Sequence, residues 1–332
     1  MKEEEIRPKQ LFDDYLALVR KDIQVIFGVK DEFVDVDCPA CGEGGGEEAL
    51  EKLGFIYKSC SNCESLYLSP RPTEDMINTF YREGESVKFW SERFYKETAE
   101  ARRLKIYGPR AEYIEKLFSE NPEWNKEQFV DVGAGFGIFL EEISKLNLFL
   151  NVFGIEPAPN MAAICKDKGF SILETPAEKI GAGSVLADFA TSFEVFEHVH
   201  SFENFLKSIH NILKPKGLFL FTTLTIDGFD LQVLWDQSKS IYPPHHINLI
   251  SKKGIKCLLK TCGFDLVEIS TPGKLDVDIV ANMFREKKDL ELPRFVRHLV
   301  ETADDEAREA FQLFLQENLL SSHIRVIAQK NI

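Results

Sequence analysis

The sequence predicts an α/β fold built on an open, mostly parallel β-sheet. Short apolar runs that fit buried strands alternate with segments of helical periodicity between about residues 126 and 272. A glycine-rich stretch at residues 129–137 follows the first of these runs and leads directly into a helical pattern. Glycine lets a ligand approach the backbone closely, and the first N–H groups of a helix are free to face that ligand. The pattern therefore predicts a cofactor site at the first strand–helix junction of the sheet.

The spacing of the glycines separates two classes of cofactor. The dinucleotide pattern is G-x-G-x-x-G, whereas Gly133, Gly135 and Gly137 form G-x-G-x-G and the sixth position is Ile138. Asp131 lies two residues before the first glycine. The resulting D-x-G-x-G-x-G pattern resembles the first motif of class I S-adenosylmethionine-dependent methyltransferases. An NAD-dependent enzyme is the alternative, and the absence of a glycine at position 138 counts against it.

A second carboxylate supports the same cofactor. A strand pattern at residues 152–155 ends in Glu156, about 20 residues after the first glycine, which is the spacing expected for a group that binds ribose hydroxyls. The resemblance implies adenine contacts from residues 176–178 and places Glu194 beside the methionine part of the cofactor. The cofactor-binding residues expected in total are Asp131, Gly133, Ala134, Gly135, Glu156, Pro157, Ala177, Glu178 and Glu194.

The remaining strands follow the same resemblance, which covers roughly residues 126 to 272. Further strands are expected at residues 171–173, 188–193, 218–221, 264–269 and 324–328. The segment 214–217 is expected to end the helix that precedes the strand at 218–221. Class I methyltransferases finish with an antiparallel seventh strand beside the fifth. The resemblance therefore implies a Rossmann-like sheet of strand order 3-2-1-4-5-7-6.

Four cysteines near the N-terminus have the spacing of a metal site. Cys38, Cys41, Cys60 and Cys63 form C-x2-C-x18-C-x2-C. Two such knuckles bring four thiolates into a tetrahedron, which suits a structural Zn²⁺ and leaves no open position for catalysis. The other cysteines are expected to pack against helices, namely Cys165, Cys257 and Cys262.

The ribbon and the segments after it resemble one group of methyltransferases. Residues 67–73, Phe80-Tyr81 and residues 271–278 are similar to those of a bacterial and archaeal group (type 11/12/23-like) found in polysaccharide and secondary metabolism. In that group a zinc ribbon and a helical connector precede the catalytic domain. Residues 275–320 are interpreted as a helical insertion that serves as a substrate lid, a dimer surface or additional core. The expected division of the chain is an N-terminal helix at 1–36, a zinc ribbon at 37–72, a helical connector or cap at 73–125, and a cofactor-binding methyltransferase domain at 126–332.

The connector contains aromatic side chains with two candidate roles. Trp90, Phe94 and Tyr95 lie within its helical pattern. They either cap the cofactor pocket or pack in the core, and core packing is the favoured role.

Acidic and histidine side chains follow the fourth strand, whose carboxyl end faces the crevice of such a sheet. Glu194, Glu197 and His198 form E-x-x-E-H. This motif resembles that of O-methyltransferases of ubiquinone synthesis and of small-RNA 2′-hydroxyl methylation, and the resemblance implies a divalent metal there. In the RNA group a downstream histidine joins the site, and His245 or His246 is the candidate. Other class I members carry the motif without a metal, and there a histidine acts as a general base or lines the pocket. Both interpretations stay open.

Composition and net charge limit the classes of binding partner and the compartment. A net charge of −14 argues against binding to a phosphate backbone. The sequence has no apolar run of membrane-spanning length and no secretory pattern at its start. Seven cysteines that include a zinc spacing suit a reducing compartment. A cytoplasmic protein without a membrane partner is therefore expected, and an oligomer is compatible with the sequence.

The sequence thus predicts an S-adenosylmethionine-dependent methyltransferase. The methyl group is expected to move by direct displacement to an oxygen, with His198, His245 or His246 as the base. The resemblance implies a sugar, nucleotide-sugar or glycan hydroxyl as the acceptor. Two alternatives remain. One is an RNA methyltransferase, and the other is a cofactor-binding protein without turnover whose ribbon docks a partner.

Overall fold

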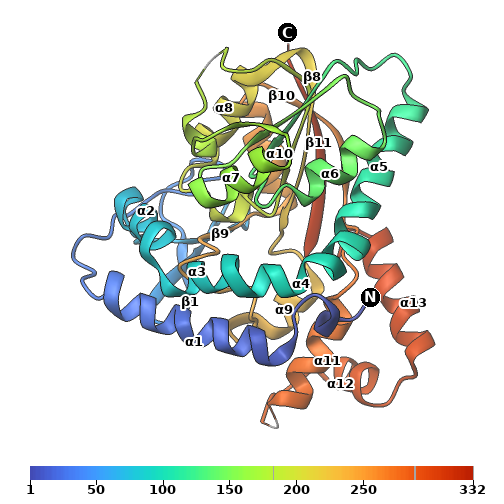
Figure 1. Ribbon diagram of the computed structural model, residues 1–332. Coiled ribbons are helices and arrows are strands. Elements are labelled where there is room, and N and C mark those ends of the chain that lie inside the picture. The colour runs from blue at the N-terminus through green and yellow to red at the C-terminus, as the bar shows by residue number, and fades with distance from the viewer. Residues whose placement is uncertain (182, 288, 332) are drawn as a thin grey trace.

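The fold is organised around one large β-sheet. The computed structural model describes residues 1–181, 183–287 and 289–331. Its seven-stranded sheet has the order β6-β5-β4-β7-β8-β11-β10 (Figure 1). The neighbouring strands from β6 to β8 are parallel, and β11 runs antiparallel to both β8 and β10. The predicted order 3-2-1-4-5-7-6, with its antiparallel strand beside the fifth, is confirmed.

Helices cover both faces of this sheet. The strands are β4 (Gln128–Val132), β5 (Asn151–Ile155), β6 (Ser171–Leu173), β7 (Ala187–Phe193), β8 (Leu213–Leu224), β10 (Phe264–Ser270) and β11 (His323–Lys330). The helices are α5 (Gly108–Glu120), α6 (Ile138–Lys145), α7 (Pro159–Asp167), α8 (Phe202–Ile212) and α10 (Lys252–Thr261). The apolar residues of α5 and α6 fill one core, and those of α8 and α10 fill another on the opposite face. The central strands β4 and β7 are buried along most of their length because both faces of the sheet are covered.

One predicted boundary is wrong. The segment 214–217 was expected to end a helix before a strand at 218–221, but α8 already ends at Ile212 and β8 begins at Leu213. The segment lies within β8, where the pairing with β7 shifts between Leu213 and Leu218. Lys216 adopts a left-handed conformation with φ of 61° at this irregularity. The strand accommodates the segment as a bulge, which adds residues without ending the pairing.

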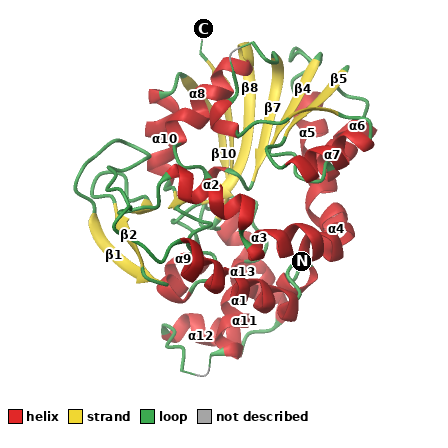
Figure 2. Ribbon diagram, turned by 60° about the vertical axis from the view of Figure 1, so that its left-hand side comes forward, coloured by secondary structure: helices red, strands yellow, loops and turns green. Residues whose placement is uncertain are grey.

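A second, smaller sheet is formed by three strands of the ribbon that carries the four cysteines and by one strand from elsewhere in the chain. Its strands are β1 (Glu47–Lys52), β2 (Phe55–Ser59), β3 (Leu66–Leu68) and β9 (Asn248–Leu249), in that order. Figure 2 shows this sheet beside the carboxyl edge of the large one. Strand β9 comes from the loop after β8, so the two sheets share a segment of chain.

Helices from the N-terminal part of the chain cross below the large sheet (Figure 1). They are the short η1 (Glu3–Glu5), α1 (Lys9–Ile26), α2 (Glu74–Glu83), α3 (Glu85–Phe89) and α4 (Tyr95–Arg102), with π-helical turns at η2 (Trp90–Phe94) and η3 (Arg103–Tyr107). Helix α1 buries Leu11, Tyr15 and Val19, which recur every fourth residue on one face.

The last group of helices follows β10 and precedes β11 in the chain. It comprises α11 (Asp276–Glu286), α12 (Arg294–Glu301) and α13 (Asp305–Glu317), which follow one another in the segment 275–320. They pack with α9 (Phe229–Leu234), next to the one-turn η6 (Trp235–Gln237). The remaining short turns are η4 (Ala177–Lys179) and η5 (Phe196–His198). Over the described residues, none of the helices combines the length and apolarity needed to cross a membrane.

Candidate active site

The glycine-rich turn connects β4 to α6 at the carboxyl edge of the large sheet. Gly133, Gly135 and Gly137 have positive φ values of 83°, 55° and 71°, which disfavour residues with a Cβ. A Cβ on Gly133 would lie 2.4 Å from Cγ2 of Val195, so the turn packs directly on the segment after β7. A Cβ on Gly135 would meet no atom of the described residues within 4 Å. The turn is therefore closed at its first glycine and open at its second.

Two buried carboxylates flank this turn. Glu156, directly after β5, accepts hydrogen bonds from the backbone N–H groups of Gly135 (2.8 Å) and Ala158 (2.9 Å). Asp131 within β4 accepts a hydrogen bond of 2.8 Å from the Thr191 hydroxyl. Burial raises the pKa of Asp131 to about 7 and raises the pKa of Glu156 above its usual value. Both predicted acids thus lie at the turn, one of them bonded to it.

The other expected cofactor residues lie around the same edge. Ala134 is buried behind the turn, and its N–H donates to the Ile155 carbonyl. Pro157 is exposed after Glu156, and Ala177 is buried in η4. Glu178 accepts a hydrogen bond of 3.1 Å from the backbone N–H of His200.

Glu194 binds a set of groups that the sequence did not indicate. It has a positive φ of 55°, and one of its carboxylate oxygens lies 2.6 Å from both Arg110 Nη2 and His323 Nε2 and 2.7 Å from Thr222 Oγ1. Although burial opposes it, these partners hold the pKa of Glu194 well below its usual value. Arg110 belongs to α5 and lies in no recognisable motif, so the sequence carries no signal for its role. His323 had a usable signal, because the first residue of an antiparallel strand lies at the same edge as the carboxyl ends of its parallel neighbours.

A cluster of possible metal ligands lies beside Glu194. One ligand atom each from Glu197, His198 and His246 falls within 4.8 Å of the other two. Glu197 and His198 come from the turn η5 after β7, and His246 comes from the loop after β8. The motif set expected from the sequence was Glu194, Glu197 and His198. In the structure Glu197 and His198 meet His246, whereas Glu194 is engaged by Arg110 and His323.

Hydrogen bonds orient all three side chains of this cluster. His198 Nδ1 lies 2.9 Å from the His245 carbonyl, and His246 Nδ1 lies 2.6 Å from the Ser240 carbonyl. Because a carbonyl only accepts, each Nδ1 carries the proton and each Nε2 keeps its lone pair. Burial lowers the pKa of His198 to about 4 and that of His246 to about 3, so both rings are neutral at physiological pH. Glu197 accepts a hydrogen bond of 2.9 Å from Thr223.

His245 lies next to the cluster and faces away from it. It is buried, and its Nε2 lies 2.7 Å from the Tyr15 hydroxyl on α1. Its ring also contacts Phe80 edge-on, with the ring centroids 4.7 Å apart. The histidine that joins Glu197 and His198 is therefore His246.

The four cysteines of the ribbon also converge. Their sulfur atoms lie within 4.8 Å of one another, and the pairs Cys38–Cys63 and Cys41–Cys60 are each 3.5 Å apart. A disulfide would need a sulfur–sulfur distance of about 2.05 Å. Tetrahedral zinc–thiolate bonds of about 2.3 Å place sulfurs about 3.8 Å apart, close to the distances seen.

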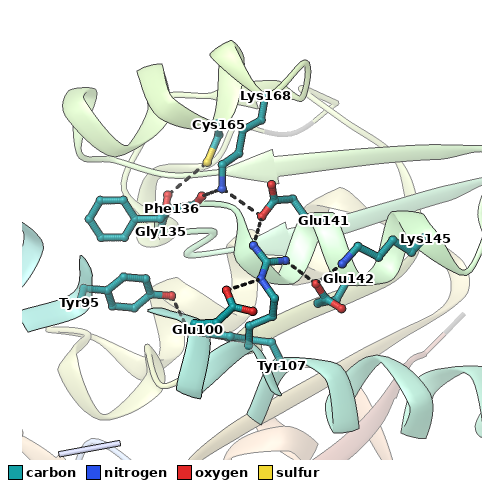
Figure 3. A network of polar contacts seen from close by, with 11 residues as sticks. Tyr95, Glu100, Tyr107, Gly135, Phe136, Glu141, Glu142, Lys145, Cys165 and Lys168 are labelled. Atoms are coloured by element: carbon teal, nitrogen blue, oxygen red, sulfur yellow. Dashed lines mark hydrogen bonds and ion pairs between the residues drawn. The ribbon is translucent and has the colours of Figure 1, made fainter. Parts of the chain in front are cut away.

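The connector helices reach over the glycine-rich turn. The ring of Tyr95 stacks on Phe136 of the turn with centroids 4.6 Å apart, and its hydroxyl lies 2.8 Å from that of Tyr107 (Figure 3). Trp90 and Phe94 instead contact α1, where their rings pack near Tyr15. Tyr95 therefore packs on the turn, whereas Trp90 and Phe94 pack between the connector and α1.

Ion pairs fasten the same connector to the helix after the turn. The Arg103 guanidinium pairs with Glu141 and Glu142 of α6. Lys168 donates to Glu141 and to the Phe136 carbonyl of the turn (Figure 3). The connector and the turn therefore form one continuous polar network at this edge.

Comparison with known proteins assigns the chain to a family. Residues 92–269, more than half of the chain, match a family model described as a methyltransferase domain. The chain belongs to the methyltransferase domain family. This methyltransferase uses S-adenosylmethionine, and the open space at Gly135 beside the Glu156 carboxylate fits such a ligand.

Individual relatives share part of the chain. A ubiquinone biosynthesis O-methyltransferase of Colwellia psychrerythraea is 29% identical over 167 residues, which are 44% of this chain and 67% of that protein. Its counterpart in Cereibacter sphaeroides is 29% identical over 149 residues, which are 39% of this chain and 60% of that one. The present chain therefore spans about two thirds or less of the length of these relatives.

A similar solved structure is that of the plantazolicin methyltransferase BpumL with SAH. It has 14% identity and a TM-score of 0.49, and the match covers 77% of this chain and 94% of the other.

Proposed function

We propose that this methyltransferase transfers the methyl group to a hydroxyl oxygen, by direct displacement from the sulfonium of the cofactor. The cluster of Glu197, His198 and His246 carries the proposal. It follows β7 and β8 at the same sheet edge as the glycine-rich turn, and Val195 connects the two because it packs on Gly133. An acceptor oxygen placed between the turn and the cluster would be aligned with the methyl group.

The ligand set suits a divalent cation. One carboxylate and two neutral imidazole nitrogens are typical ligands of divalent first-row metals. A bound cation would lower the pKa of the acceptor hydroxyl and orient it. The protein's own groups support this role, because the carbonyls of His245 and Ser240 fix the two rings and Thr223 fixes the carboxylate. In the metal-free alternative, the free Nε2 of His198 removes the hydroxyl proton as a general base.

A sugar, nucleotide-sugar or glycan hydroxyl is the proposed acceptor. The zinc-ribbon architecture supports it, by resemblance to a methyltransferase group of polysaccharide metabolism. An aromatic hydroxyl is the second candidate, because the curated relatives carry the name of ubiquinone biosynthesis O-methyltransferases. The net charge of −14 argues against RNA as the acceptor.

The four cysteines are proposed to hold a structural zinc ion. Their donor set and their sulfur–sulfur distances fit tetrahedral zinc, and four thiolates leave no open coordination position. The proposed domain division places this ion in a ribbon of residues 37–72.

Binding and turnover measured on the same preparation test the proposal. S-adenosylhomocysteine is titrated calorimetrically, and methyl transfer is then followed with panels of sugars and of phenols, with and without Mg²⁺, Mn²⁺ or Co²⁺. Cation-dependent transfer to a sugar hydroxyl is expected. Methyl transfer that continues after a chelator has removed the cations would favour the histidine base. Transfer to phenols alone would replace the proposed acceptor class.

A further inference from the structure

The ribbon is joined to the loop that carries His246. Strand β9 of this loop pairs with β3 of the ribbon, where Asn248 lies opposite Tyr67. The Leu68 N–H donates to the Ile247 carbonyl at 2.9 Å. The buried Tyr57 hydroxyl of β2 donates to the carbonyl of His246 itself at 2.7 Å. The backbone around this cluster histidine is therefore held by groups of the ribbon.

At the end of the ribbon, Arg71 makes the most extensive of these contacts. Its side chain is buried, with the residue 1% exposed, and it donates to the Leu68 carbonyl (3.1 Å), the His200 carbonyl (2.9 Å) and the Asn248 side-chain oxygen (3.0 Å). Burial lowers its pKa to about 10, so the guanidinium stays charged at neutral pH. Among the residues that the structure describes, no carboxylate lies within ion-pair distance of it.

A buried charge without a counter-ion lowers the stability of the fold. The hydrogen bonds that the Arg71 guanidinium donates must offset this cost. The guanidinium presents several N–H groups in a rigid plane, which lysine cannot reproduce. Here the fork spans two separate backbone segments, one at His200 and one at Asn248.

These two segments carry the cluster histidines. The Asn248 side chain, which accepts from Arg71, donates in turn to the Val199 carbonyl at 2.9 Å. Val199 is the neighbour of His198, and Asn248 lies two residues after His246. His198 Nδ1 closes the ring of contacts at the His245 carbonyl. Arg71 and Asn248 therefore link the two backbone segments that carry the imidazoles of His198 and His246.

The cysteine knuckle itself is part of this connection. The hydroxyl of Ser251, which caps the helix after β9, donates to the Cys63 carbonyl. The backbone N–H of Ser251 donates to Ser65 at 3.0 Å, and Ser65 Oγ lies 3.2 Å from the Cys63 sulfur. Hydrogen bonds thus join the cysteine site to Ser251, which follows β9 in the segment after His246.

We propose that the ribbon is a positioning element for the Glu197–His198–His246 cluster and that Arg71 is its central positioning residue. The ribbon acts through Arg71, Asn248 and Tyr57 on the backbone that carries the two imidazoles. The part of this proposal that concerns cation affinity rests on the proposed function, whereas the positioning of the rings does not.

The test uses the full-length, zinc-loaded protein and the variants Arg71→Met, Arg71→Lys and Asn248→Ser. Zinc content, S-adenosylhomocysteine affinity and melting temperature establish that each variant is folded. Two readouts then follow the cluster. One is the tautomer and chemical shifts of the histidine ring nitrogens in two-bond ¹H–¹⁵N spectra without added metal. The other is the affinity for Co²⁺, measured from its visible absorption.

Arg325→Met is the matched control. Arg325 of β11 is also a largely buried arginine, but its side chain lies over the Tyr113 ring and pairs with Glu268 of the edge strand β10. The control variant is expected to leave the ring signals of His198 and His246 and the Co²⁺ affinity unchanged.

Folded Arg71 and Asn248 variants are expected to shift the signals of His198 and His246 and to lose about 10- to 100-fold in Co²⁺ affinity, the usual effect of removing a group that orients metal ligands. Unchanged ring signals would overturn the proposal. If the wild-type protein binds no Co²⁺ at this cluster, the cation in the proposed function is refuted, and the ring signals still decide the positioning role. Failure of all three variants to fold, including Asn248→Ser, would assign Arg71 to general stability and overturn the proposal.

Discussion

The two halves of the candidate active site, the proposed cofactor half and the Glu197–His198–His246 cluster, are built in different ways. In the cofactor half, the glycine-rich turn and Glu156 follow two strands that are consecutive in the chain and adjacent in the sheet. In the cluster half, Glu197 and His198 meet His246 from another loop, and the ribbon holds both segments. The first half depends on local backbone shape, and the second depends on contacts between distant segments.

This difference predicts which substitutions each half should tolerate. The cofactor half uses glycines and backbone N–H groups, so it is sensitive to added side-chain atoms and insensitive to the ribbon. The cluster half uses side chains with oriented lone pairs, so it is sensitive to small losses of hydrogen bonding. Substitutions should therefore separate cofactor binding from cation binding.

The largest effect is expected for Gly133→Ala. The new Cβ would lie 2.4 Å from Val195 at a positive φ of 83°. Backbone strain and overpacking together amount to several kcal/mol, so the affinity for S-adenosylhomocysteine in calorimetry should fall by about 100-fold or more. Gly181→Ala, where the Cβ meets no described atom within 4 Å, is the control. An affinity for Gly133→Ala equal to that of the control would show that the turn tolerates a Cβ.

Glu197→Gln should affect the other half alone. Burial and the neighbouring Glu194 raise the pKa of Glu197 to about 8, so the carboxyl group loses its proton when a cation binds. Glu197→Gln keeps the shape of the side chain but removes this ionisable ligand, so Co²⁺ affinity should fall by about 100-fold. The affinity for S-adenosylhomocysteine should stay at the wild-type value. Glu203→Gln, on the exposed surface of α8, is the control. Equal losses for both ligands would contradict the separation of the two halves.

Glu156→Gln is the converse experiment. The substitution replaces a charged carboxylate, which accepts hydrogen bonds from the backbone N–H groups of Gly135 and Ala158, with a neutral amide. The affinity for S-adenosylhomocysteine should therefore fall by about tenfold. Co²⁺ binding should be unaffected. Glu174→Gln, after β6, removes an exposed carboxylate and serves as the comparison. A change in Co²⁺ affinity alone would reverse the assignment of the two halves.

The smallest effect concerns the pH dependence of cofactor binding. Because burial raises the pKa of Asp131 to about 7, this carboxyl group changes from neutral to ionised near neutral pH. The ionised form favours the protonated amino group of the ligand, so S-adenosylhomocysteine affinity should rise by about three- to tenfold from about pH 6 to about pH 8. Asp131→Asn should remove this rise. An unchanged slope in that variant would assign the titration to another group.

Much of the fold was predictable because its signals are local. The alternation of apolar strands with helical segments, and the glycines after β4, predicted the parallel sheet, and the resemblance to class I methyltransferases implied its strand order. The structure confirms both. The paired Cys-x2-Cys knuckles predicted the convergence of four sulfurs, because each knuckle positions its two sulfurs within one short turn. The start of β8 was missed because the segment 214–217 has the composition of a turn, and the strand continues through it because Leu213 and Leu218 on either side both pair with β7.

The strand–helix alternation, the glycine-rich turn and the cysteine site could be predicted from the residues alone, since each follows from the conformational preferences of neighbouring residues. Three features came from the packed structure: which histidine joins Glu197 and His198, the binding of Glu194 by Arg110 and His323, and the connection that Arg71 makes between the ribbon and the cluster. These contacts join residues that are far apart in the chain, and no local pattern records which distant side chain fills a given hydrogen bond. Their geometry arises when the large sheet, the connector and the ribbon pack together.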